Sequence, residues 1–87
     1  MKVRVQLFAT LRRFGKEFEV ECDGTLESAF RNLADKLGKE FLVEVFDENG
    51  DIRKDRIVTV DGRNVKDEKP KLREGSIIAV FPPIAGG

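Results

Sequence analysis

Histidine, tryptophan and tyrosine are absent from this sequence of 87 residues, and cysteine occurs once, as Cys22. Without histidine the chain cannot form a Ser-His-Asp triad, a histidine metal site or an imidazole pH switch. A single cysteine excludes an internal disulfide and any cysteine pair that could bind zinc. The absence of tryptophan and tyrosine removes two of the side chains on which nucleic-acid bases stack. We therefore expect no metal site and no nucleic-acid partner.

The chain also lacks an excess of either charge, because 16 Lys and Arg residues balance 16 Asp and Glu residues. This balance argues against binding to nucleic acid or to an anionic membrane by bulk electrostatics. No apolar run approaches the roughly 18 residues that span a bilayer. No charged-then-apolar leader precedes the first strand, so we expect a cytoplasmic protein without a membrane partner. A single domain of this size buries only about 60–65% of its unfolded surface, which leaves no room for a large bound cofactor.

Polar and apolar residues alternate over 2–8 and again over 17–22, which is the period of a β-strand. The short polar link at 10–16 between them predicts a turn and an antiparallel hairpin. Its outward glutamates are typical of a solvated strand face rather than of acid/base catalysis. The thiol of Cys22 faces inward and has no basic neighbour to lower its pKa, so we expect a structural cysteine. The residues expected to face the core are Val3, Val5, Leu7, Phe18, Val20 and Cys22, and the outward glutamates are Glu17, Glu19 and Glu21.

A helix is predicted between Thr25, a good N-cap, and Gly38, a good helix terminator. Between them the apolar residues recur at helical spacing and form one stripe over about three turns. The stripe predicts a helix that packs one face against a sheet. Its members are Leu26, Ala29, Phe30, Leu33, Ala34 and Leu37.

The second half of the chain is less regular. Apolar residues at 41–46 fit either a short strand or a helical turn, and the pattern leaves both open. Strands are predicted at 57–60 and 76–81, with a brief return through 64–65. The order predicts an α+β fold of the β-grasp type, a mixed sheet of four to five strands with one main helix packed on one face. We expect the opening hairpin and the final strand to lie side by side in the middle.

The end of the chain stands out. We divide the sequence into a β-grasp domain, residues 1–81, and an extended C-terminal tail, residues 82–87. Pro82-Pro83 is stiff and directs the tail away from the sheet. Gly86-Gly87 has no Cβ atoms and can thread a narrow channel. The alternative is a frayed terminus without a function, but such an end needs neither stiff prolines nor terminal glycines.

Two aromatic residues are expected beside this tail. By alternation Phe8 and Phe81 face away from the core. If the first and last strands run parallel as neighbours, the two rings meet at the end of the sheet where the tail leaves. An exposed apolar patch at this place predicts a docking surface, unless loops fold over it.

These residues carry a resemblance to a known family. The chain resembles the small subunit of molybdopterin synthase, a ubiquitin-like sulfur carrier, over essentially its whole length. One position departs from the pattern, since Asn64 stands where the family has an apolar contact. The stretches that carry the resemblance are Phe81-Pro82-Pro83-Ile84-Ala85-Gly86-Gly87, Leu7-Phe8-Ala9, Phe46-Asp47-Glu48-Asn49-Gly50, Val60-Asp61-Gly62-Arg63-Asn64-Val65 and Glu74-Gly75.

The resemblance implies a function that needs no catalytic side chain of the chain's own. A ubiquitin-activating-like adenylating enzyme, which uses ATP, adenylates Gly87, and a sulfur donor converts it to a thiocarboxylate. The large subunit of molybdopterin synthase takes in the tail, and sulfur passes to a pterin precursor in molybdenum-cofactor biosynthesis. Gly86 allows the tail to thread. The residues implied to contact the partner are Phe8, Phe81, Pro82, Pro83, Ile84 and Ala85.

Four other functions stay open at this stage. The same Gly87 could be joined to protein lysines, as in a ubiquitin-like modifier. The sulfur could instead serve tRNA thiolation or thiamin synthesis. The chain could also be a plain β-grasp interaction domain whose tail is incidental.

Overall fold

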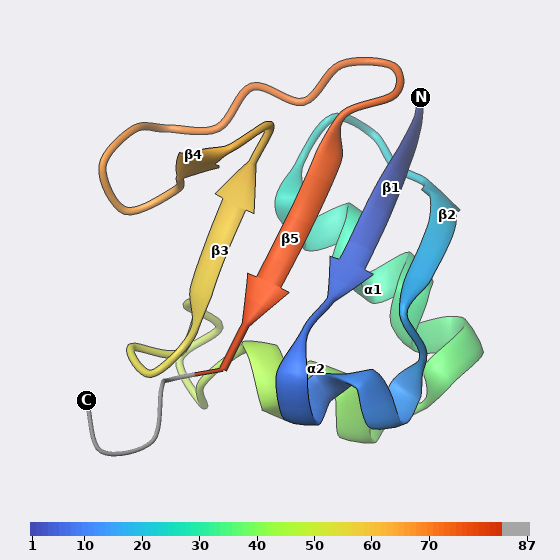
Figure 1. Ribbon diagram of the computed structural model, residues 1–87, viewed down its shortest axis with the longest axis vertical. Coiled ribbons are helices and arrows are strands. Elements are labelled where there is room, and N and C mark those ends of the chain that lie inside the picture. The colour runs from blue at the N-terminus through green and yellow to red at the C-terminus, as the bar shows by residue number, and fades with distance from the viewer. Residues whose placement is uncertain (83–87) are drawn as a thin grey trace.

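The two alternating stretches near the N-terminus pair as an antiparallel hairpin in the computed structural model, which describes residues 1–82. Val20 and Cys22 face the core as predicted, and Phe18 is half-buried against it. The elements are, in order, β1 (Lys2–Leu7), η1 (Ala9–Phe14), β2 (Glu17–Glu21), α1 (Leu26–Leu37), α2 (Lys39–Val45), β3 (Ile57–Val60), β4 (Arg63–Asn64) and β5 (Ile77–Phe81) (Figure 1).

The link between β1 and β2 is a 3₁₀ helix, η1, rather than the simple turn that the sequence predicts. Leu11 is almost fully buried, and its burial holds this segment against the end of the sheet. The chain then enters β2 through Gly15, which has a φ of 134°. A Cβ at this position would collide with the ring of Phe18, so only glycine allows the close return of the chain.

The predicted helix is confirmed as α1, with the predicted ends. The Thr25 hydroxyl accepts a hydrogen bond from the Ser28 N–H at 3.1 Å, which caps the first turn. Gly38 ends the helix with a φ of 97°. The apolar stripe packs on the sheet, fully along its middle and partly at its two ends. The fully buried members are Ala29, Phe30, Leu33 and Ala34, and the half-buried members are Leu26 and Leu37.

The ambiguous stretch at 41–46 is mostly helical, because it forms α2. Phe41 and Val45 lie one helical turn apart on the same face, and neither is exposed to solvent. The Phe41 ring packs against Phe30 of α1 with the ring centroids 6.1 Å apart. Contact with α1 therefore favours the helix. A helix places these two side chains one turn apart on one face, whereas a strand would place them much farther apart along an extended chain.

The sheet has the order β2-β1-β5-β3-β4, with β1 and β5 parallel and the other neighbours antiparallel. The first and last strands lie in the middle as expected, but β2 is an edge strand. Pairing β5 with β1 on one side and with β3 on the other leaves β2 with a single neighbour. This topology, with α1 across the sheet, is the predicted β-grasp fold.

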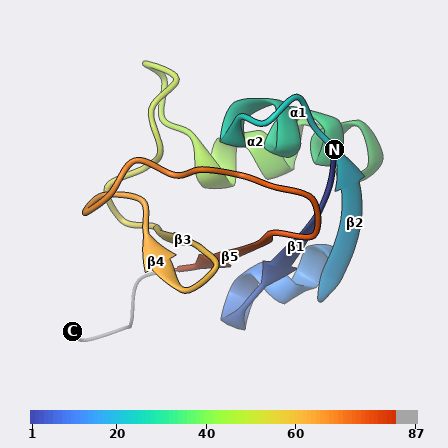
Figure 2. The same cartoon turned by 90° about the horizontal axis from the view of Figure 1, so that it is seen from above.

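Figure 2 shows that α1 and α2 cover the same face of the sheet. The core lies between them and the inward side chains of the central strands, which are almost fully buried. No helix in residues 1–82 is long and apolar enough to cross a membrane. The fully buried strand residues of this core are Val3, Val5, Leu7, Val58, Ile78 and Val80.

Candidate functional site

Phe8 and Phe81 stack on each other where β1 and β5 end. Their ring centroids are 4.4 Å apart and the ring planes differ by 12°. The Phe8 N–H donates to the Val80 carbonyl at 3.2 Å, which ties the end of β1 to β5. The Arg12 guanidinium carbon lies 5.6 Å from the Phe8 ring centroid and places a positive charge on this stack. The structure therefore confirms the prediction that the two rings meet.

The stack continues into an apolar strip on the sheet face that the helices leave uncovered. Ile57 is the neighbour of Phe81 in register and is 40% exposed, and Ile77 is 39% exposed. Ala79 is buried although it points outward, because the longer side chains of its register partners on β1 and β3 flank it. We call this strip, formed by Phe8, Ile57, Ile77, Ala79 and Phe81, the open-face patch.

The other half of the same face is polar. Arg4 of β1 lies 3.7 Å from the Glu17 carboxylate, and Gln6 donates to Glu17 at 2.8 Å. The outward residues Glu19 and Glu21 complete this half, with Lys2 at 3.9 Å from Glu19. The predicted solvated strand face is present, and it limits the apolar area to β5 and its β3 side.

Asn64 has a structural role at the position where the resemblance leads us to expect an apolar contact. Its side-chain oxygen accepts from the Lys66 N–H at 2.9 Å, and its carbonyl accepts from Asp67 at 3.1 Å. The residue thus begins the loop that leads to β5. Along β3 the apolar part of this face ends before Thr59, which is the register partner of Asn64.

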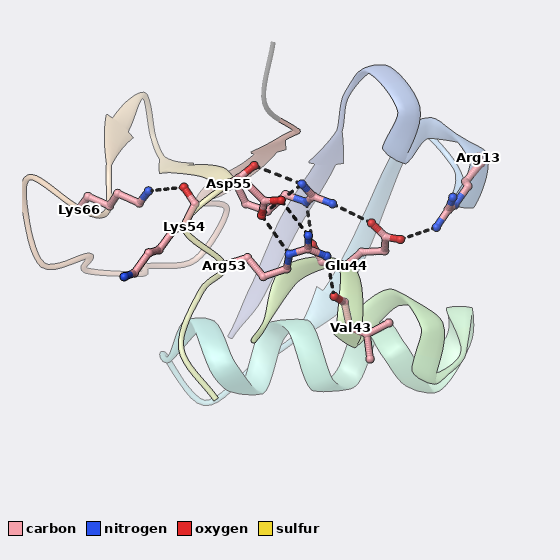
Figure 3. A network of polar contacts seen from close by, with 8 residues as sticks. Arg13, Val43, Glu44, Arg53, Lys54, Asp55 and Lys66 are labelled. Atoms are coloured by element: carbon pink, nitrogen blue, oxygen red, sulfur yellow. Dashed lines mark hydrogen bonds and ion pairs between the residues drawn. The ribbon is translucent and has the colours of Figure 1, made fainter. Parts of the chain in front are cut away.

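A charged cluster joins α2 to η1 and to the segment before β3 (Figure 3). The Glu44 carboxylate forms ion pairs with the Arg13 guanidinium at 2.6 Å and with the Arg56 guanidinium at 2.8 Å. Arg56 is only 7% exposed, and its Nε donates to the Glu44 carbonyl at 2.7 Å. The hydrogen bond from Arg56 holds the pKa of Glu44 below its usual value, and the charge of Arg13 adds to this effect.

The lowered pKa of Glu44 predicts a stability loss in acid. A carboxylate with a lowered folded-state pKa stabilises the fold fully above its unfolded value, 4.5 here, and loses this contribution as pH falls through the folded value. Melting temperatures of the parent and Glu44→Gln should therefore differ at pH 7 and converge below about pH 4.5. A difference that stays constant down to pH 3 would contradict this assignment.

The structure places only part of the predicted tail site. Phe8, Phe81 and Pro82 lie within the described residues, and each is half-buried. Pro83, Ile84, Ala85, Gly86 and Gly87 lie outside them. Sequence reasoning missed Ile57, although the alternation with Val58 and Val60 carries the signal for an outward side chain at this position.

The described residues contain neither an exposed cysteine nor a cluster of metal ligands. Cys22 is buried, as predicted for a structural thiol. Residues 1–82 contain no group of three Cys, Asp or Glu side chains that could hold a metal ion. A hollow of about 610 Å³ lies between Asp61, Arg63, residues 68–71 and Arg73, at the end of the sheet away from the aromatic stack.

Fold and patch together define a ubiquitin-like β-grasp protein with an exposed apolar face next to its C-terminal segment. The ThiS family model matches residues 5–87, and the chain belongs to this family of ubiquitin-like sulfur carriers. Among curated protein sequences none matches the chain significantly.

Solved structures with the same fold come from several branches of ubiquitin-like proteins. SAMP1 from Haloferax volcanii is 24% identical with a TM-score of 0.80, and the match covers 100% of both chains. A chain of the Amycolatopsis orientalis BexX/CysO complex is 16% identical with a TM-score of 0.82, covering 98% of this chain and 99% of that one. A chain of the complex of subunits 1 and 2 of molybdopterin-converting factor from Helicobacter pylori is 20% identical with a TM-score of 0.62, covering 100% of both.

Proposed function

We propose that this chain is the sulfur-carrying small subunit of a molybdopterin synthase and that its Gly87 carboxylate becomes a thiocarboxylate. The observation that carries the proposal is the position of the tail. β5 ends at Phe81 within the open-face patch, and the segment Pro82 to Gly87 follows directly. The family match also extends through residue 87. The tail that carries the reactive group would then begin at the docking surface.

The chemistry uses the end of the chain itself. The free α-carboxyl group has a pKa near 3.5 and is anionic at neutral pH. Its oxygen attacks the α-phosphorus of ATP, and diphosphate leaves. A sulfur donor at the oxidation level of hydrosulfide then adds to the acyl carbon, and AMP leaves with the oxygen. The resulting thiocarboxylate carries a soft sulfur nucleophile, which forms a C–S bond to the pterin precursor as an oxygen substituent leaves that carbon. Water then cleaves the bond between the acyl carbon and sulfur, so the sulfur stays on the precursor and Gly87 returns to a carboxylate.

The partners act on the chain in sequence. In this proposal the open-face patch docks first on a ubiquitin-activating-like adenylating enzyme and then on the large synthase subunit, and the tail enters each active site. Two of the similar structures are complexes with a second protein, which supports a partner for this chain as well. The adenylation step needs ATP, so the proposal includes a cytoplasmic site of action.

Mass spectrometry tests the proposal directly. The chain is incubated with an adenylating enzyme, ATP and a sulfur donor, and the C-terminal peptide is analysed. We expect the mass gain of one sulfur-for-oxygen exchange on the peptide that ends in Gly87. The same reaction without ATP is the control, because an unactivated carboxylate is a poor electrophile. A C-terminal peptide of unchanged mass in the complete reaction would contradict the proposal.

A second candidate function is that of a ubiquitin-like protein modifier. It is favoured by the likeness to H. volcanii small archaeal modifier protein 1, at 25% identity and a TM-score of 0.72. Both functions begin with the adenylation of Gly87 and differ in the acceptor. Affinity capture from the native host separates them: a large synthase subunit supports the sulfur carrier, and a ladder of heavier conjugates supports the modifier.

Substituting the aromatic stack should weaken docking without unfolding the chain. Phe8→Ala or Phe81→Ala removes a half-buried aromatic anchor, and such anchors are commonly worth about 2 kcal/mol, or about 30-fold in affinity. Calorimetric titration against the adenylating enzyme or the large synthase subunit measures the change. Val43→Ala is the matched control, since Val43 is 64% exposed on α2. Unchanged affinity of both aromatic variants would exclude the open-face patch as the docking surface.

A further inference from the structure

We propose that Glu44 is a positioning residue that holds the open-face patch in its docking conformation. Its carboxylate links η1, which follows Phe8, to the segment before β3, which begins with Ile57. The inference rests on the proposed function, in which this patch receives the partner. We call Glu44 with Arg13 and Arg56 the Glu44 clamp.

The two arms of the clamp use different oxygens of one carboxylate. Arg13 Nη2 donates to Glu44 Oε1 at 2.6 Å, and Arg56 Nη2 donates to Oε2 at 2.8 Å. Both are charge-assisted hydrogen bonds at short distances, the stronger class of such bonds. Figure 3 shows Glu44 on α2 reaching toward Arg13 across the gap between two elements. One side chain thus joins three segments that are distant in sequence.

The Arg56 arm is fixed to the body of the domain. Besides Glu44, its guanidinium donates to the Asp55 carbonyl at 3.1 Å. Asp55 is itself held by Arg53 through two hydrogen bonds, at 2.9 and 2.7 Å. The next residue after Arg56 is Ile57, whose register partner is Phe81. This arm therefore sets the position of the β3 side of the patch.

The Arg13 arm holds a segment that begins in a strained conformation. Ala9, directly after Phe8, has a φ of 53°, in the left-handed region that residues with a Cβ rarely adopt. Such a conformation persists only where the surroundings hold it. Buried Leu11 anchors the middle of η1, and Arg13 anchors its end to Glu44. Two anchors after the strained residue keep Phe8 stacked on Phe81.

Rigid placement of the patch favours docking, because a surface that is ordered before binding loses less conformational entropy when the partner arrives. Arg13 is 59% exposed, so its removal leaves buried Arg56 paired with Glu44. The exposed arm can therefore be cut while the domain stays folded.

The test cuts that arm with Arg13→Met, which keeps a long unbranched side chain but removes the guanidinium from Glu44 and from the Phe14 ring, whose centroid lies 4.8 Å from the guanidinium carbon. Arg31→Met is the matched control, because Arg31 also pairs with a glutamate at 2.7 Å, on the exposed face of α1. We expect the amide hydrogen exchange of Phe8 and Leu11 to rise about two- to fivefold in Arg13→Met, the range that corresponds to an exposed ion pair. Exchange at these amides in Arg31→Met should equal that of the parent. Parent-like exchange in Arg13→Met would overturn the clamp.

Affinity for the adenylating enzyme gives the functional readout, through a double-mutant cycle of Arg13→Met and Glu44→Gln. We expect Arg13→Met to weaken binding about two- to fivefold and Glu44→Gln to weaken it at least as much, because Glu44→Gln cuts both arms. The double variant should bind like Glu44→Gln alone, because the Arg13 arm is already cut in that variant. Additive losses would mean that Arg13 touches the partner directly, and unchanged affinity would mean that the clamp does not serve docking. Either result overturns the proposal. If the parent itself fails to bind, the proposed function is wrong, and the exchange rates still report on the clamp.

Discussion

Deletion of Gly87 is expected to abolish thiocarboxylation while leaving the melting temperature unchanged. The deletion moves the terminal carboxylate back by about 3.5 Å along an extended chain. A misplacement of 1 Å at a reacting centre can cost about a hundredfold in rate. The buried core of the described residues reaches only to Val80, so the domain keeps its packing. Mass spectrometry of the activation reaction and a thermal melt measure the two effects separately.

Gly86→Ala is the companion variant. It adds one Cβ and restricts the backbone at a position where, in the proposed function, the tail threads a narrow channel of its partner. We expect slower thiocarboxylation and a parent-like melt. If the chain without Gly87 is thiocarboxylated at the parent rate, the tail is not the reactive site, and a plain interaction domain becomes the better interpretation.

Phe30→Ala is expected to cost about 3–5 kcal/mol in the free energy of unfolding. Phe30 is fully buried, and its ring contacts Phe41 and Phe46 with centroid distances of 6.1 and 5.6 Å. Truncation leaves a cavity where α1, α2 and the sheet meet. The loss is a large share of the roughly 5–15 kcal/mol that holds a small domain together.

Chemical denaturation in urea measures this change. Val43→Ala again serves as control, since its exposed side chain loses little burial and surface substitutions usually change stability by less than about 0.5 kcal/mol. A loss below about 1 kcal/mol for Phe30→Ala would show that the ring does not close the core as the structure indicates.

The separation of stability from function is the main consequence of this architecture. The core residues lie on the inward faces of β1, β2, β3 and β5 and on the helices, while the open-face patch lies on the other side of the sheet. Substitutions in the patch or the tail should therefore change docking and sulfur transfer with small effects on unfolding. The acceptor of the sulfur depends on the partner, which makes capture of the partner the most informative experiment on function.

Much of the fold follows from local patterns in the sequence. Alternation predicted β1, β2, β3 and β5 to within a residue or so, and the stripe between Thr25 and Gly38 predicted α1. The secondary structure of such stretches can be predicted because each one buries a single face. The spacing of its apolar residues therefore matches the period of the backbone. The same alternation predicted that Phe8 and Phe81 face outward and meet, given parallel neighbours.

The sequence by itself determined the strands, the main helix, the outward aromatic pair and the Gly-Gly end, because these features depend on neighbouring residues. Only the tertiary structure decided the helical form of α2, the edge position of β2, the burial of Ala79 and the linking of Arg13, Glu44 and Arg56. These features depend on contacts between segments far apart in the chain. Such contacts leave no periodic signal, since a charged residue at a given position has the same local pattern whether its partner lies four or forty residues away.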